Sequence, residues 1–163
     1  MKHFTKTELI RCFNEDKAQR CKGCQLKQAA SGLPYGIEES IISLGEDVLD
    51  PAREKLGMPV VVNSGFRCPL HNAKVGGVGG ASKPGSGRVS QHVVGQAVDV
   101  HCADNRRLAK IIVANGKWDQ LILYPTFIHV SYKRQGGNRK QILRKTATGY
   151  QAISAAEIKK KNI

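Results

Sequence analysis

The sequence predicts an α+β fold in which a small, mostly antiparallel sheet is flanked by helices. Apolar residues recur at helical spacing over 38–56 and again over 105–115, and short β-branched or alternating runs lie between and after these segments. The 163 residues are expected to form a single domain, 1–163. No apolar run reaches the eighteen residues of a transmembrane helix, so no membrane span is expected.

The predicted helices carry typical start and stop signals. Thr5 or Thr7 can begin a first helix, with Glu8 three residues after Thr5 as in a capping box. In the segment 38–56, Pro51 is expected to kink the helix or to begin a second one, because proline lacks the N–H that a helix interior requires.

The predicted strands surround the second helical segment. The β-branched run 60–62 suits a buried strand, and the glycine-rich segment 65–95 is expected to form a long loop. A strand is predicted at 96–101, and two more at 118–124 and 127–132.

The net charge of +13, from 26 Lys and Arg against 13 Asp and Glu, implies anionic partners. Nine of these bases and only one acid lie in 133–163, which is expected to be a basic C-terminal extension. Nucleic acid is disfavoured as a partner, because the segment has no interleaved aromatic residues beyond Tyr132 and Tyr150 and no recognisable binding motif. A solvated helix near 154–161 is the commonest explanation for such a charge run.

The N-terminal stretch has no apolar run of signal-peptide length, which predicts synthesis in the cytoplasm without processing. Without an export signal the five cysteines are expected to be reduced. Cys12, Cys21 and Cys24 could hold a second, structural metal together with His3, but buried or free thiols are the favoured interpretation.

Three polar residues in the strand-rich region, His92, Asp99 and His129, match the three protein ligands of a catalytic zinc site. Seven residues separate His92 from Asp99, so neither a strand nor a helix can bring both to one ion. The chain must turn back between them, and Gly95 can adopt the necessary backbone angles. His101 shares the predicted strand face of Asp99 and is a competing ligand. Each of these residues could instead be an ordinary hydrogen-bonded side chain.

The string Ser90-Gln91-His92-Val93-Val94-Gly95-Gln96-Ala97-Val98-Asp99 resembles the S-x-H-x-x-G-x-A-x-D signature of the zinc D-Ala-D-Ala carboxypeptidases, peptidase family M15. The segments SGFRCP (64–69), VGG (75–77), WDQLI (118–122) and FIHVS (127–131) are similar to further elements of that family. The resemblance covers about residues 4–132. It implies the zinc D-Ala-D-Ala peptidase or hedgehog-like fold and suggests a phage or prophage origin.

The resemblance also implies individual roles. His92, Asp99 and His129 would bind zinc, while Arg67 and Ser90 would hold the substrate peptide. A guanidinium suits that task because it forms two-pronged bonds to a carboxylate. The structural alternatives are a surface or turn-stabilising cation for Arg67 and a loop or capping hydroxyl for Ser90.

One departure from the family pattern concerns catalysis. Members usually carry an acidic residue a few positions before the last zinc-binding histidine, but 123–128 contains no carboxylate. Asp119 is the nearest upstream acid and a weak catalytic candidate, for which a structural hydrogen-bonding role is favoured. A missing proton shuttle is worth a factor of about 10² to 10⁴, so metal binding is predicted more firmly than activity.

The leading hypothesis is a monomeric zinc metallopeptidase, of D-Ala-D-Ala carboxypeptidase or endolysin type, that cleaves peptide bonds next to D-amino acids in peptidoglycan. Without an export signal it would act at the cell wall after release, as a phage lysin does. One alternative is a catalytically silent zinc-binding module of the same fold that binds wall peptides. Another is a basic nucleic-acid-binding protein with structural zinc.

Overall fold

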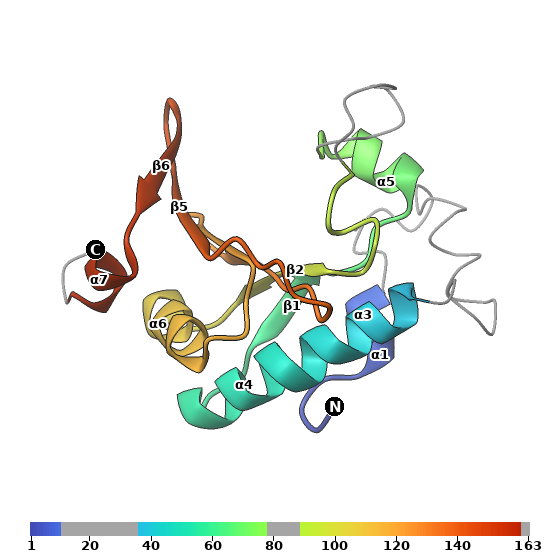
Figure 1. Ribbon diagram of the computed structural model, residues 1–163, viewed down its shortest axis with the longest axis horizontal. Helices are drawn as coiled ribbons and strands as arrows, with labels where there is room; N and C mark the ends of the chain where they lie inside the picture. The colour runs from blue at the N-terminus through green and yellow to red at the C-terminus, as the bar shows by residue number, and fades with distance from the viewer. Residues whose placement is uncertain (11–35, 78–88, 161–163) are drawn as a thin grey trace.

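The computed structural model describes residues 1–10, 36–77 and 89–160. Within these ranges helices pack against one six-stranded sheet of order β1-β2-β4-β3-β5-β6 (Figure 1), which confirms the predicted α+β class. All neighbouring strands are antiparallel except β3 and β5, which are parallel. The strands are β1 (Val61–Ser64), β2 (Ala97–His101), β3 (Gln120–Leu123), β4 (Ile128–Ser131), β5 (Gln141–Thr146) and β6 (Gly149–Ile153).

The helices of these ranges begin largely where the sequence predicts. They are α1 (Lys6–Ile10), α3 (Ile37–Leu44), the π-helix η2 (Gly45–Leu49), α4 (Asp50–Leu56), α5 (Pro69–Lys74), α6 (Asn105–Asn115) and α7 (Ala155–Lys159). Thr5 rather than Thr7 caps α1: the N–H of Thr5 donates to Glu8 Oε2 at 2.7 Å, and the N–H of Glu8 donates to Thr5 Oγ1 at 3.2 Å. Pro51 lies in the first turn of α4, directly after the π-helical turn. None of these helices is long and apolar enough to cross a bilayer.

The two faces of the sheet have different surroundings. One face carries the strand residues that alternate into the core, and α3, α4 and α6 cover it (Figure 1). These core residues are Val62, Val98, Val100, Leu121, Ile128, Val130, Ile142 and Ile153. The opposite face carries Asp99, Ile122, His129 and Leu143, which line a cleft. The strand period of two therefore separates the core of the protein from its candidate site.

The first strand differs from its prediction as a buried strand. β1 is an edge strand that pairs only with β2 among the described strands, and Val61 is 50% exposed while Val62 is buried. A β-branched run predicts a strand, but it does not distinguish a central position from an edge. The predicted loop 65–95 contains α5, which Cys68 caps, and its stretch 78–88 lies outside the described residues.

The C-terminal segment contributes two strands that the sequence analysis did not predict. β5 adds to the sheet beside β3, and β6 pairs with β5 as the outer strand of a hairpin. The helix predicted near 154–161 is α7, which begins at a capping box between Ser154 and Glu157. It is not fully solvated, because Ile158 is buried in the core.

Candidate metal centre

Strands β2 and β4 place Asp99 and His129 side by side on the open face of the sheet. The two residues are direct cross-strand partners, and their neighbours along each strand point into the core. His129 Nδ1 lies 2.9 Å from Asp99 Oδ1. Residues directly opposite each other in an antiparallel pair have Cβ atoms about 5 Å apart, so the register alone brings the imidazole to the carboxylate.

His92 reaches the same point from a turn, as the spacing predicts. Gly95 has φ +71°, and the N–H of Gln96 donates to the carbonyl of Gln91 at 2.8 Å, which closes the turn before β2. His92 Nδ1 lies 2.7 Å from the carbonyl oxygen of Gly65. A carbonyl oxygen can only accept, so Nδ1 carries the proton and Nε2 presents a lone pair.

That lone pair faces the other two side chains. His92 Nε2 lies 3.2 Å from His129 Nδ1 and 3.4 Å from Asp99 Oδ1. Burial lowers the pKa of His92, against the opposing influence of Asp99, and therefore favours the neutral imidazole. Burial also opposes ionisation of Asp99, but the neighbouring His129 and His92 outweigh it and lower the pKa of the carboxyl. Neutral imidazole and carboxylate are the forms that bind a metal ion.

The donor set fits a zinc ion. One ligand atom from each of His92, Asp99 and His129 lies within 4.8 Å of the others, and two imidazole nitrogens with one carboxylate oxygen are typical of catalytic zinc. The carbonyl of Gly65 orients His92 in the way that outer partners orient metal-binding histidines. The competing ligand His101 lies outside this cluster, because its Nδ1 contacts Asn63 Oδ1 at 2.5 Å.

Arg67 connects the loop after β1 to the same cluster. Its Nε donates to Ser64 Oγ at 2.7 Å, and its Nη2 pairs with Asp99 Oδ2. The guanidinium thus holds the outer oxygen of Asp99, while Oδ1 faces the two histidines. Its side chain is 14% exposed and lines the cleft. Arg67 therefore positions a candidate ligand in this structure.

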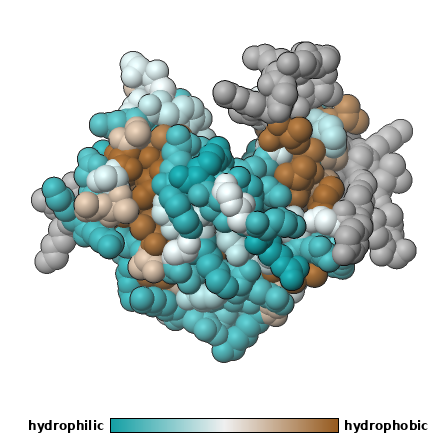
Figure 2. All heavy atoms as spheres, in the orientation of Figure 1, coloured by the Kyte–Doolittle hydropathy of each residue, from teal (hydrophilic) through white to brown (hydrophobic). Residues whose placement is uncertain are grey.

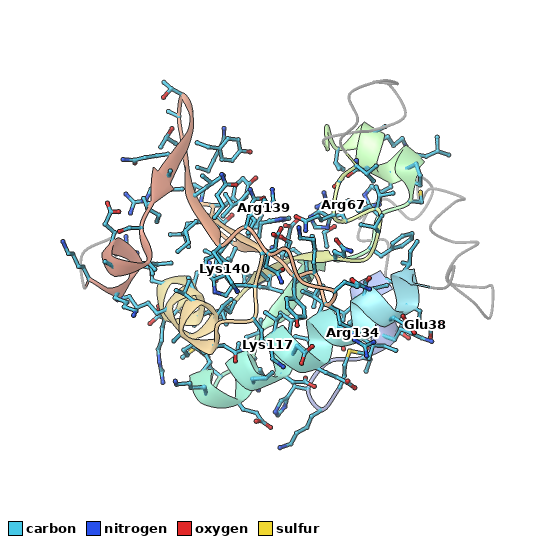
Figure 3. The ribbon with its side chains drawn as sticks, viewed as in Figure 1. Glu38, Arg67, Lys117, Arg134, Arg139 and Lys140 are labelled. Carbon is cyan, nitrogen blue, oxygen red and sulfur yellow. The ribbon has the colours of Figure 1, made fainter. Side chains whose placement is uncertain are left out.

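The cleft over the open face has a volume of about 1180 Å³. Figure 2 shows the surface hollowed between the β5–β6 hairpin and α5. Ser90 lines the cleft next to His92, and Arg67 and Arg139 come from its two sides (Figure 3). The cleft is large enough for a short peptide to reach the candidate metal ligands.

Asp119, the weak catalytic candidate, is fully buried among hydrogen-bond donors. Arg139 donates to it from its backbone N–H at 2.6 Å and from its guanidinium at 2.9 and 2.5 Å. Gln91 and Ser131 donate to the same carboxylate at 2.9 and 3.2 Å. Burial opposes ionisation, but Arg139 outweighs it and lowers the pKa of Asp119 to about 2. These surroundings favour the structural role.

Two members of this network were missed from the sequence. Arg139 appeared only as one base of the C-terminal run, and Gln91 only as a variable position between Ser90 and His92. The Arg139 guanidinium also donates to Gln91 Oε1 at 2.6 Å. This hydrogen bond connects the segment just before β5 to the turn that carries His92. No local pattern marks such a contact, because 48 residues separate the two side chains.

The thiols take no part in the described cluster. Cys68 is buried and Cys102 is half-buried, and neither belongs to the cluster of His92, Asp99 and His129. Cys12, Cys21 and Cys24, for which a second metal site was considered, lie outside the described residues.

Replacing Gly95 by alanine is expected to destabilise the protein by about 3 kcal/mol, because a side chain there combines positive φ with steric overlap. An added Cβ would lie 2.7 Å from the carbonyl oxygen of Ile37 and 2.9 Å from Ile41 Cγ1. Gly57→Ala is the matched control, since Gly57 has φ +74° but open space around it, and about 1 kcal/mol is expected. Urea unfolding of both variants measures the difference, and equal losses would contradict the steric argument.

The comparison with known families agrees with this site. The family model described as Peptidase M15 matches residues 2–131, which is more than half of the chain. The matched stretch contains His92, Asp99 and His129 and ends at the last residue of β4. A comparison with curated proteins finds no match. The chain therefore belongs to the peptidase M15 family, whose members are metal-dependent peptidases.

Proposed function

We propose that the protein is a zinc metallopeptidase that hydrolyses peptide bonds next to D-amino acids in peptidoglycan stem peptides. The observation that carries the proposal is the convergence of His92, Asp99 and His129 at the floor of a peptide-sized cleft. Zinc held by these three side chains would polarise the scissile carbonyl and lower the pKa of a water molecule to about 7. The metal centre and the resemblance to the D-Ala-D-Ala carboxypeptidases together support this substrate class.

Arg67 and Ser90 are the proposed substrate-holding residues. Arg67 lines the cleft, and Nε and Nη2 are the guanidinium nitrogens that bond to described residues. Nη1 is therefore suited to a terminal carboxylate of the peptide. The Ser90 hydroxyl, which lines the cleft two residues before His92, would bond the peptide backbone. Both contacts would fix the scissile bond relative to the metal ligands.

A silent peptide-binding module is the second candidate, and the chemistry of the cleft favours it in one respect. Among the described residues that line the cleft, the only acids are Asp99 and Asp119. Asp99 faces the histidines and Asp119 is bound to Arg139, so neither carboxyl is free to shuttle protons. A chain of this kind could bind wall peptides at the zinc centre with little turnover.

Cleavage of synthetic stem peptides by the zinc-loaded protein tests the proposal. Peptides ending in D-Ala-D-Ala are expected to be cleaved, and matched peptides with L-Ala at these positions are expected to be cleaved at least about 100-fold more slowly. Products are identified by mass spectrometry. Saturable binding of the D-peptide without cleavage would support the module. If the protein neither binds nor cleaves the peptide, both functions are contradicted.

The proposed substrate contact of Arg67 is tested in the same assay. Arg67→Lys keeps the positive charge but loses the rigid guanidinium that directs Nη1 to the substrate while Nε and Nη2 hold Ser64 and Asp99, so kcat/KM is expected to fall by about 10- to 100-fold. The zinc content is measured in parallel, because Arg67 also pairs with Asp99. Arg134→Lys, at an exposed cation, is the control and should leave kcat/KM unchanged.

A further inference from the structure

Two tyrosines, Tyr124 and Tyr150, meet on the open face of the sheet. Their hydroxyl oxygens lie 3.1 Å apart, and both side chains line the cleft that contains Asp99 and His129. Tyr124 lies in the segment 123–128, where the family pattern has an acid and this chain has none. Tyr150 comes from β6, beyond the stretch that matches the family.

The register of β3 and β4 fixes the direction of Tyr124. Ile122 pairs with His129, and the N–H of Tyr124 donates to the carbonyl of Phe127 at 3.0 Å, which extends the ladder past the end of β3. Residues two apart on a strand share a face, so Tyr124 projects on the side of Ile122 and His129. The phenol therefore belongs to the face of the sheet that carries the candidate metal ligands.

The ring of Tyr124 is held between two aromatic neighbours. It stacks on Phe127 with ring centroids 4.3 Å apart and planes inclined by 11°. It packs edge to face against Tyr150, with ring centroids 6.4 Å apart. Lys145 Nζ lies 4.6 Å from the centroid of the Tyr150 ring. Contacts of this kind restrict both torsions of the side chain, so the hydroxyl has a defined position before substrate binds.

The Tyr124 hydroxyl stays protonated at neutral pH. Burial raises its pKa, as do the hydrogen bond to Tyr150 and the negative charge of Asp99, while Arg67 acts in the opposite direction. A protonated phenol donates a hydrogen bond but does not act as a base. The Tyr124 hydroxyl can therefore donate a hydrogen bond to a substrate oxygen on which negative charge develops.

The cations that line the described cleft already interact with carboxylates. Arg67 is paired with Asp99, and Arg139 with Asp119. Lys133 Nζ lies 3.6 Å from Asp119 Oδ1 and is drawn towards that carboxylate. Tyr124 is a neutral donor that is hydrogen-bonded only to another hydroxyl among the described residues, so it can turn to a substrate oxygen without breaking an ion pair.

We propose that Tyr124 is a catalytic residue whose hydroxyl donates a hydrogen bond to the oxyanion that forms on the scissile carbonyl, and that Tyr150 is the positioning residue for it. This inference rests on the proposed peptidase function. No bond to Tyr124 forms or breaks, and the phenol keeps its proton throughout. Removing one donor of this kind typically costs about 10²- to 10³-fold in kcat.

Kinetics of single tyrosine variants give the first test. Tyr124→Phe is expected to lower kcat about 100-fold with KM changed less than about threefold, because the hydrogen bond is made in the transition state. Tyr150→Phe is expected to lower kcat by about 3- to 10-fold, since it removes only the positioning contact. Tyr132→Phe is the control, because Tyr132 does not line the cleft, and its kcat and KM should equal those of the wild type. The zinc content of all variants should match that of the wild type.

Binding of a phosphinic dipeptide, which mimics the tetrahedral oxyanion, gives a readout independent of turnover. By calorimetry, zinc-loaded Tyr124→Phe is expected to bind it about 100-fold more weakly than the wild type, with unchanged affinity for the uncleaved peptide. Equal affinity for the phosphinate would overturn the role of Tyr124 even if the wild type is an active peptidase. A wild type that binds the phosphinate without cleaving any peptide would contradict the proposed function and, with it, the catalytic role of Tyr124; weaker binding by Tyr124→Phe would then support only its hydrogen bond to the phosphinate. A wild type that does not bind the phosphinate would overturn both.

Discussion

Replacing His92 or Asp99 by alanine is expected to lower zinc affinity by more than about 100-fold, because each supplies one of only three protein ligands. After dialysis against a weak chelator, the wild type should retain about one zinc per chain and each variant less than about 0.1. Native mass spectrometry measures the zinc content of the wild type and of each variant. Peptidase activity should fall in proportion to the zinc retained, which separates loss of metal from loss of catalysis.

His101→Ala is the matched control for these variants. His101 lies on β2 two residues after Asp99 and shares its face, but its imidazole bonds to Asn63. The variant should therefore keep about one zinc per chain. Loss of zinc from His101→Ala, or its retention by Asp99→Ala, would contradict the ligand assignment. Circular dichroism should show that all three variants remain folded.

The centre could be predicted from the sequence because its parts depend on local geometry. The spacing from His92 to Asp99 demands a turn, and Gly95 has the positive φ that was expected. Strand parity placed Asp99 and His129 on one face, which the register of β2 and β4 confirms. Parity could not separate Asp99 from His101, since that choice depends on Asn63 in a different strand.

The surroundings of the centre could not be predicted, because they depend on contacts between distant segments. β5 lies parallel to β3, a pairing that brings Arg139 to Asp119 across 20 residues. The charge run in 133–163 was visible in the sequence, but its pattern did not reveal which bases bond to a buried acid. The sequence showed only that a carboxylate is missing from 123–128. The partner of Tyr124 is Tyr150, which lies on β6, a strand that the sequence did not predict.

Asp119→Asn is expected to destabilise the protein by about 3 kcal/mol at neutral pH, because it leaves Arg139 without its counter-ion and places an amide NH₂ among donors. Urea unfolding measures the loss. Asp47→Asn is the matched control: its ion pair with Lys117, at 2.6 Å, is solvent-exposed and should be worth less than about 0.5 kcal/mol. Equal losses in the two variants would contradict the structural role of Asp119.

The pH dependence of the same variant tests whether the Asp119 carboxylate is the stabilising form. Its pKa is lowered to about 2 from an ordinary value of 3.8, so the folded protein binds its proton less readily than the unfolded chain. The resulting stabilisation, about 2 kcal/mol, is complete above the ordinary value and is lost as the pH falls through about 2. The stability gap between wild type and Asp119→Asn should therefore narrow as the pH is lowered from about 6 to about 2.5, whereas the gap for Asp47→Asn should stay small. A gap that does not change with pH would mean that packing, rather than the charge of Asp119, stabilises the junction between β3 and β5.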